Sequence, residues 1–250
     1  MNRAFKYGDG VFETMKVVNA KVPFLEFHLN RLKSSCAYLD IDVSWKEISQ
    51  LINKAIETKS NGVLRFQVYR SGESFFELGK QAEYYYDWKD ANPAYSLNPE
   101  GINLGLYIEN YKATSLLYNL KSANYLLYIK ALQYAQDKGL DDVLIVNGYG
   151  NIVEALTSNI VLVKDDKMYT PDLASGCVDG VMLKVLNSLG YSIHSKPFNF
   201  QEVIDADAVF LTNAVKGVQW VSSFNGLEKP CWSHNQKMID KLNTFCGIKD

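Results

Sequence analysis

One segment rich in proline and asparagine limits how this chain can fold. Residues 89–101, KDANPAYSLNPEG, contain two prolines and two asparagines. Proline lacks the backbone N–H that helices and inner strands need, and asparagine favours turns, so no regular element is expected to run through this segment. On either side of it, apolar residues recur with strand and helix periods. The pattern predicts an α/β (α+β) protein of two lobes, residues 1–95 and 96–250, with a linker at about 89–101.

The first lobe is predicted to combine strands with two helices. Residues 62–70, GVLRFQVYR, alternate as a strand does, and 83–88 is the expected partner strand. Apolar residues at helical spacing predict the two helices. The remaining elements expected in this lobe are helices over 27–39 and 45–58 and strands over 11–18 and 22–27.

The second lobe is predicted to contain two helices, two hairpins and further strands. The first helix ends at Gly139, a residue suited to a helix C-terminus. We expect its apolar residues 126, 129, 132 and 135 to be buried, and Ser122 or Asn124 to cap its start. The elements expected here are strands over 102–109 and 207–212, helices over 124–138 and 180–189, and hairpins over 142–155 and 159–171.

Composition narrows the class of protein. A chain of 250 residues, 47% of them hydrophobic, can bury a core without disulfides. Its net charge of −2 indicates no basic surface for nucleic acid. Four cysteines without a C-x-x-C pair, and only three histidines, make a zinc site unlikely and predict free thiols. No apolar run has the length of a membrane span and no signal peptide is visible, so the sequence predicts a cytoplasmic protein.

Two cationic residues stand out as candidates for chemistry. Lys121 lies just ahead of the predicted helix 124–138. A free lysine has a pKa of about 10.4, and burial or a nearby cation must lower that value before the amine becomes a nucleophile. Arg31, in HLNRL, presents a planar guanidinium that suits phosphate oxygens. Taken singly, each residue is more simply explained as a solvated surface cation.

An acid and a helix start form a second set of candidates. Glu154 ends an apolar strand and is followed by Thr157 and Ser158. A hairpin edge explains this pattern equally well. Residues 175–183, SGCVDGVML, open a helix whose first amides belong to Gly180, Val181 and Met182, and a helix start can bind an anion. A plain cap by Asp179 is the simpler alternative for that segment, as a plain turn is for YGDGVFET at 7–14.

The combination of these residues resembles a known family. The motifs YGDGVFET, HLNRL, KSANYL, VEALTSNIV, GCVDGVM and FLTNAVKGV follow one another in the order found in class IV aminotransferases, the fold-type IV pyridoxal-phosphate enzymes. The resemblance runs from residue 2 to residue 221. It implies the two-lobed fold of the D-amino-acid aminotransferases, with pyridoxal 5′-phosphate as cofactor and a homodimer whose active site lies between the lobes and near the partner. The chain begins where the family's second strand begins, so the first strand is expected to be missing.

The resemblance also implies a role for each matching residue. Lys121 would form the internal aldimine and move the substrate α-proton, and Glu154 would face the pyridine nitrogen. Arg31 would bind the phosphate. Tyr125 would lie near the ring hydroxyl. Other residues expected around the cofactor are Thr157, Ser158, Gly180, Val181, Met182, Asn213 and Ala214, and those proposed for the substrate side are Tyr7 and Arg70.

Two departures from the family pattern bear on the reaction. Ala155 stands where the family has glycine after the acid, and Ala214 stands where many aminotransferases carry a hydroxyl for the phosphate. The segment YRSGESFFELGK lacks the second arginine and the histidine by which D-amino-acid aminotransferases hold the substrate carboxylate. KSANY and TNAVKGV are closest to the 4-amino-4-deoxychorismate lyases.

The resemblance therefore implies a lyase that releases pyruvate and 4-aminobenzoate, a folate precursor. A class IV aminotransferase of branched-chain or D-amino-acid type is the first alternative, because it shares every cofactor contact. A non-catalytic relative that binds pyridoxal phosphate or a partner protein is the second.

Overall fold

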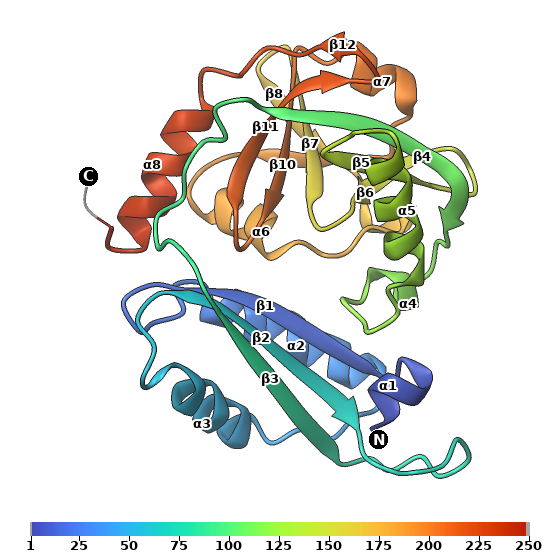
Figure 1. The fold of residues 1–250 in the computed structure, drawn as a ribbon, viewed down its shortest axis with the longest axis vertical. Helices are drawn as coiled ribbons and strands as arrows, with labels where there is room; N and C mark the ends of the chain where they lie inside the picture. The colour runs from blue at the N-terminus through green and yellow to red at the C-terminus, as the bar shows by residue number, and fades with distance from the viewer. Residues whose placement is uncertain (1, 249–250) are drawn as a thin grey trace. The chain divides into compact units, whose positions relative to one another are not determined.

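The computed structural model describes residues 2–248, which form two compact units (Figure 1). Within the described residues, unit 1 comprises the chain up to Ala94 together with Leu120–Asn124, and unit 2 comprises Tyr95–Asn119 and residues 125–248. The change of unit at residue 94 falls inside the segment predicted as a linker. The short return to unit 1 differs from the prediction, which placed Lys121 in the C-terminal lobe.

Unit 1 is a three-stranded sheet covered by helices. The strands pair in the order β1-β2-β3, all antiparallel. Inward-facing side chains from β1, β2 and the two longer helices form one core, which includes Met15, Leu32, Ile52 and Phe66. The elements are α1 (Arg3–Tyr7), β1 (Gly10–Val17), α2 (Leu25–Tyr38), α3 (Trp45–Ile56), β2 (Gly62–Arg70) and β3 (Ala82–Asp90).

One strand predicted in unit 1 does not form. Residues 22–27 were expected to return beside β1, but α2 already begins at Leu25 and the turn contains only an isolated bridge between Val18 and Lys21. Strand β1 pairs with β2 instead, and Phe24 is buried just ahead of the first turn of α2. The predicted partnership of 62–70 with 83–88 is confirmed as the β2–β3 pair.

Unit 2 is built on a nine-stranded mixed sheet. Its path is β6-β5-β4-β11-β10-β7-β8-β9, with β12 beside β11, and both predicted hairpins are present as β5–β6 and β7–β8. The strands are β4 (Ile102–Lys112), β5 (Asp142–Asn147), β6 (Ile152–Ala155), β7 (Asn159–Lys164), β8 (Lys167–Thr170), β9 (Ile193–Ser195), β10 (Ala208–Asn213), β11 (Gly217–Phe224) and β12 (Leu227–Glu228). The helices are α4 (Leu116–Asn119), α5 (Leu126–Asp137), the 3₁₀ turn η1 (Leu173–Ser175), α6 (Val181–Ser188), α7 (Phe200–Ile204) and α8 (Asn235–Phe245).

Helix α5 turns a different face to the core than its sequence suggested. Leu126, Ile129 and Leu132 are 80%, 47% and 44% exposed, whereas Ala131 and Ala135 are buried. The two alanines belong to a cluster with Tyr107 and the inward residues of β5, where small side chains let helix and sheet approach closely. The predicted burial is therefore wrong for three of the four positions and right for Ala135.

Two further features were searched for within residues 2–248. No helix in this range is long and apolar enough to cross a membrane. No group of three or more His, Cys, Asp or Glu side chains in the same range is arranged to hold a metal ion.

Candidate cofactor site

Lys121 is held by strand-like pairing rather than by the helix that follows it. The Phe12 amide donates to the Lys121 carbonyl over 2.9 Å, and the Ala123 amide donates to the Gly10 carbonyl over 2.9 Å. Between these bonds, Ser122 forms a bridge with β1. The Lys121 Nζ atom lies 4.7 Å from the centre of the Phe12 ring. The lysine is therefore positioned in unit 1 as if by a short extra strand beside β1.

The caps predicted for the following helix are absent. Tyr125 is the N-cap residue of α5 and makes no side-chain capping bond. Asn124 instead lies against the turn before β1, where its side-chain nitrogen donates to the Gly8 carbonyl over 3.4 Å. A Cβ on Gly8 would come within 2.2 Å of Asn124 Oδ1, and the φ of Gly8 is +68°. Glycine is therefore required at this turn by both space and backbone conformation.

Arg31 is part of a buried charge cluster with Glu13 and His28. The Arg31 Nε and Nη2 atoms donate to the two Glu13 carboxylate oxygens over 2.7 and 2.5 Å. His28 Nδ1 lies 2.6 Å from Glu13 Oε2. His28 and Arg31 are three residues apart on α2, so both reach the same strand residue. Glu13 thus orients the guanidinium that was predicted to bind phosphate.

The pKa values of this cluster follow from burial and charge. Burial alone would raise the pKa of Glu13, but the charge of Arg31 and the hydrogen bonds from His28 and Arg31 outweigh it and lower that pKa to about 2. Burial is the largest cause and lowers the pKa of His28, and the charges of Arg31 and Lys121 lower it as well; together they outweigh Glu13, whose hydrogen bond and charge raise it. The cluster therefore holds an ionised Glu13 and disfavours a charged His28.

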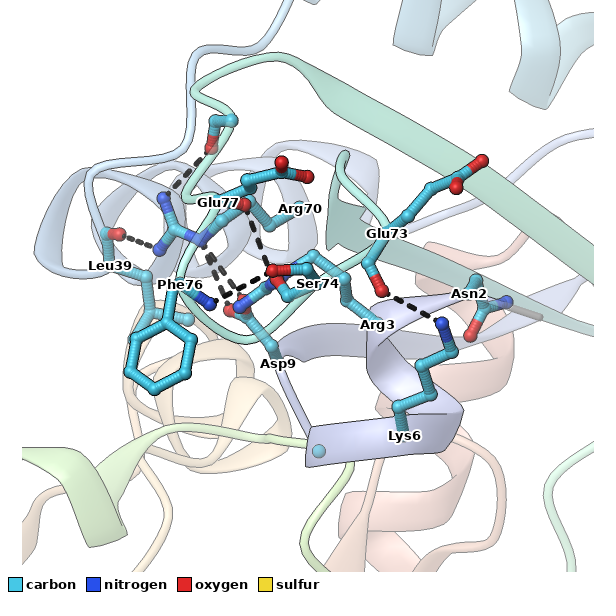
Figure 2. A network of polar contacts seen from close by, with 12 residues as sticks. Asn2, Arg3, Lys6, Asp9, Leu39, Arg70, Glu73, Ser74, Phe76 and Glu77 are labelled. Atoms are coloured by element: carbon cyan, nitrogen blue, oxygen red, sulfur yellow. Dashed lines mark hydrogen bonds and ion pairs between the residues drawn. The ribbon is translucent and has the colours of Figure 1, made fainter.

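Arg70 is engaged in a second polar network of unit 1 (Figure 2). Its Nε atom lies 3.0 Å from Asp9 Oδ2, and its terminal nitrogens donate to the carbonyls of Leu39, Asp40 and Gly79. Arg3 reaches the same Asp9 oxygen at 2.8 Å. Asp9 is the acid of YGDG, so that motif ties two arginines to the start of β1.

These contacts favour a structural role for Arg70 over the predicted substrate role. Its guanidinium already bonds one carboxylate and three carbonyls, and a guanidinium has only five donors in total. Tyr7 is 40% exposed, with its ring against Phe75 at a centroid distance of 5.5 Å. The role of Tyr7 at the substrate stays a prediction. We do not propose a substrate role for Arg70.

Glu154 is the centre of a buried polar cluster in unit 2. Its Oε1 atom accepts from the Lys112 ammonium and, over 2.6 Å, from the Tyr128 hydroxyl. Its Oε2 atom accepts from the Val178 amide over 2.9 Å. Glu154 and Lys112 are each 3% exposed. The acid is thus fixed by three donors that come from β4, α5 and the loop before α6.

The Glu154 carboxylate raises the pKa of two neighbouring groups, Tyr128 and Cys177. Burial and the Glu154 carboxylate raise the pKa of Tyr128, so this hydroxyl stays a donor. Burial and Glu154 likewise raise the pKa of the Cys177 thiol to about 12. Tyr125, predicted near the ring hydroxyl of the cofactor, lies with its ring centre 4.8 Å from that of Tyr128. Tyr125 and Glu154 therefore belong to one cluster.

The start of α6 is shaped for close approach. Gly180 is the N-cap and makes no side-chain capping bond, so Asp179, which pairs with Lys184, does not cap the helix. A Cβ on Gly180 would come within 2.0 Å of the side-chain oxygen of Asn159. The amides of Val181 and Met182 lie in the first turn of this helix, where backbone N–H groups have no partner within the helix.

Asn213 links two loops of unit 2. Its side-chain oxygen accepts from the amides of Val215 and Lys216 over 3.0 and 2.8 Å. Its side-chain nitrogen donates to the Ser158 hydroxyl over 2.9 Å and to the Thr157 carbonyl over 3.3 Å. The structure thus joins Thr157, Ser158 and Asn213. Ala214, the next residue, is held by the Tyr95 hydroxyl, which donates to its carbonyl over 2.8 Å.

Comparison with known proteins decides the family. The family described as amino-transferase class IV matches residues 10–224. The chain belongs to the class IV aminotransferases. These are pyridoxal-phosphate-dependent enzymes, so the chain is an enzyme that uses this cofactor.

Individual relatives carry more than one activity. An aminodeoxychorismate lyase of Vibrio harveyi is 25% identical over 97% of this chain and 94% of its own. A D-alanine aminotransferase of Bacillus licheniformis is 25% identical over 90% of this chain and 82% of its own. The crystal structure of 4-amino-4-deoxychorismate lyase from Pseudomonas aeruginosa is 28% identical, covers 97% of this chain and 93% of its own, and superposes with a TM-score of 0.84.

The residues present fit pyridoxal phosphate. A carboxylate has about four acceptor positions, and Glu154 uses three, which leaves one for a ring N–H. Lys121 supplies the primary amine that the cofactor aldehyde requires. The start of α6 and the guanidinium of Arg31 are the kinds of donor that bind phosphate.

Two charged residues of these clusters escaped the sequence analysis. Glu13 is a buried acid within a strand whose other central positions are mostly apolar, and Lys112 is a buried lysine at the end of β4. For Glu13 a signal existed, because an acid in an apolar strand needs a partner and a histidine and an arginine three residues apart follow. Lys112 is the last residue of the run ENYK at 109–112, and nothing in that run distinguishes it from a solvated lysine.

Proposed function

We propose that this enzyme is a 4-amino-4-deoxychorismate lyase, which converts its substrate into 4-aminobenzoate and pyruvate. The observation that carries the proposal is whole-chain similarity to enzymes of that name, 25% identity in one relative and 28% in a solved structure. The internal bonds of Arg70 support it, because they occupy the arginine that ends β2 and so disfavour its holding an amino-acid carboxylate. KSANY and TNAVKGV support it as well.

In this proposal each residue has a defined task. When bound, the cofactor withdraws electrons from the carbon that carries the substrate amine. Lys121 would hold the cofactor through its Nζ amine, and the same amine would then take the proton from the carbon that carries the substrate amine. The adjacent C–O bond breaks, the enolpyruvyl group leaves and becomes pyruvate on protonation, and the ring becomes aromatic. No oxidant is needed, because substrate and products are at the same oxidation level.

The remaining residues hold the cofactor in the proposal. Glu154 would accept a hydrogen bond from the ring nitrogen, and Tyr125 would lie near the ring hydroxyl. Arg31 and the amides of Val181 and Met182 bind the phosphate. Thr157, Ser158, Gly180, Asn213 and Ala214 shape the loops around that phosphate.

The test is the product. The purified enzyme, loaded with pyridoxal phosphate and given 4-amino-4-deoxychorismate, is expected to release 4-aminobenzoate and pyruvate in equal amounts. Lys121→Arg keeps the charge but offers no primary amine, so it is expected to lose the cofactor's visible absorbance and the activity. Lys130→Arg, on the exposed side of α5, is the matched control and is expected to keep both.

The alternative is a transaminase, favoured by the similarity to the D-alanine aminotransferase. That enzyme would move the amino group from a D- or L-amino acid to a keto acid and would form no 4-aminobenzoate. A panel of amino acids, followed through the cofactor's absorbance, separates the two reactions. Amino transfer without 4-aminobenzoate would show that the lyase proposal is wrong.

We also propose that the enzyme is a cytoplasmic homodimer. The homodimer is supported by apolar side chains left in solvent along α5, namely Leu126, Ile129 and Leu132. The location is supported by the four cysteines, which are all free thiols, as expected in a reducing compartment.

A further inference from the structure

Lys112 is the one charged partner of Glu154 among the contacts of the described chain that fix this acid. It comes from the end of β4, is 3% exposed and donates to Oε1, while the other two donors, Tyr128 and the Val178 amide, are neutral. Lys112 Nζ also lies 5.5 Å from the centre of the Tyr128 ring. A lysine buried to this extent is paired in folded proteins, and here its partner is the acid proposed to face the cofactor.

The other titratable groups nearby do not neutralise this lysine. Asp179 pairs with Lys184, and Asp172 accepts from both the amide and the hydroxyl of Ser175. Burial and Glu154 raise the pKa of Cys177, so its thiol carries no charge at neutral pH. Burial and Glu154 also raise the pKa of Tyr128, so its hydroxyl remains uncharged there. One carboxylate is thus shared between Lys112 and whatever cation approaches Glu154.

A protonated ring nitrogen would be that second cation. A single buried carboxylate cannot neutralise two buried positive charges, and like charges close together disfavour the charged form of each. We propose that Lys112 is a positioning residue that competes with the cofactor's ring nitrogen for Glu154 and keeps this nitrogen less protonated than Glu154 alone would. The inference rests on the proposed placement of Glu154 at the ring nitrogen.

This competition bears on which reaction is favoured. A less protonated ring stabilises negative charge on the substrate carbon less well. Elimination removes this charge at once by breaking the adjacent C–O bond, whereas amino transfer requires protonation at another position. A less protonated ring should therefore slow elimination less than it slows amino transfer. Lys112 would in this way favour loss of the enolpyruvyl group over amino transfer.

The direct measurement is the protonation state of the ring nitrogen. The holoenzyme is prepared with pyridoxal phosphate labelled with ¹⁵N in the ring, and the ¹⁵N chemical shift is followed against pH. In Lys112→Met, which removes the charge and keeps the length of the side chain, the protonation midpoint is expected to rise by about one pH unit or more, a tenfold change in proton affinity. Lys112→Arg keeps the charge and is expected to stay near the parent. Tyr128→Phe removes a neutral donor and is the matched control.

Several outcomes would overturn the inference. One is an unchanged midpoint in both Lys112→Met and Lys112→Gln, the latter serving if the methionine variant does not fold. Another outcome needs no variant. The ring nitrogen of the parent could stay fully protonated from about pH 6 to about pH 9, well above the pKa of a free pyridine-type nitrogen. Lys112 would then not compete measurably with this nitrogen for Glu154. Glu154→Gln separates the inference from its premise. If it leaves the nitrogen unaffected, the placement of Glu154 is wrong, whereas an effect of Glu154→Gln without one of Lys112→Met contradicts only the role of Lys112.

Discussion

At the scale of single residues, the two clusters differ in how they use charge. In unit 1, one carboxylate serves an arginine and a histidine, and the histidine need not be charged. In unit 2, the Glu154 carboxylate accepts from Lys112 and from two neutral donors, and we propose that its remaining acceptor position binds the cofactor. Both arrangements orient a group that we propose to bind pyridoxal phosphate, namely Arg31 and Glu154. Neither Glu13 nor Lys112 touches the phosphate in our proposal, so their effects should reach the cofactor through these partners.

Glu13→Gln should destabilise the protein strongly. It removes the carboxylate charge of the buried ion pair with Arg31, and breaking a buried pair by removing one partner costs about 3–5 kcal/mol in comparable cases. Urea unfolding at pH 7 measures this loss. Asp40→Asn, which breaks an exposed pair with Lys80, is the control and should change the free energy of unfolding by less than about 1 kcal/mol. Equal effects of the two changes would show that Glu13 is not a structural anchor.

The same cluster predicts how stability depends on pH. Because the pKa of Glu13 is lowered from 4.5 to about 2, its contribution is fully present above pH 4.5 and is lost as pH falls toward 2. The lowered pKa of His28 acts in the same direction, since the unfolded chain binds its proton more readily below pH 6.5. The parent should therefore lose stability on acidification below pH 6.5 and again below pH 4.5. Glu13→Gln should lack the second loss, worth about 3 kcal/mol from the pKa difference, in unfolding curves taken across this range.

At the scale of elements, most strands and helices follow from local pattern, and the failures have a common cause. Alternation and turn residues were enough to predict β2, β3 and both hairpins of unit 2. The burial of α5 was wrong because the sheet accepts the alanine face of the helix, which depends on the distance between elements and not on local hydrophobicity. The helix after Lys121 was expected to position this lysine. Residues 121–123 pair with β1 instead, a long-range contact that no local pattern records.

Gly180 allows the start of α6 to lie close to the Asn159 side chain, so replacing this glycine tests the proposed phosphate site. Gly180→Ala places a Cβ within 2.0 Å of Asn159, and either this side chain or the helix start must move. We expect a loss of about 1–3 kcal/mol in stability, the usual cost of overpacking, and a cofactor affinity lowered at least tenfold. Fluorescence titration of the apoenzyme with pyridoxal phosphate measures the affinity.

Gly148→Ala is the matched control, because nothing lies within 4 Å of a Cβ built there. It should change the free energy of unfolding by no more than about 0.5 kcal/mol and leave cofactor affinity unchanged. If Gly180→Ala weakened stability but bound the cofactor as tightly as Gly148→Ala does, the start of α6 would not be the phosphate site.

At the scale of the whole molecule, the chain passes between its two units three times within residues 2–248, after residues 94, 119 and 124. The short middle passage carries Lys121 into unit 1, while the sequence around it belongs to unit 2. A division of the chain by composition alone could find the first passage, where proline and asparagine mark a linker, but not the others, because residues 119–125 carry no such signal. Lys121, which we propose to bind the cofactor, therefore lies on a short segment of unit 1 that is flanked on both sides by residues of unit 2.

The apolar side chains left exposed on α5 lead to a prediction about assembly. Ile129 is 47% exposed and stands between Leu126 and Leu132 at helical spacing, so a charge at this position would disrupt a contact made through that face. In light scattering after size exclusion, the parent should have the mass of two chains and Ile129→Asp that of one at micromolar concentration. Leu227→Asp, at an apolar residue of β12 that is 49% exposed, is the control and should stay dimeric. A monomeric parent would refute the homodimer, and a dimeric Ile129→Asp would place the interface on another surface than α5.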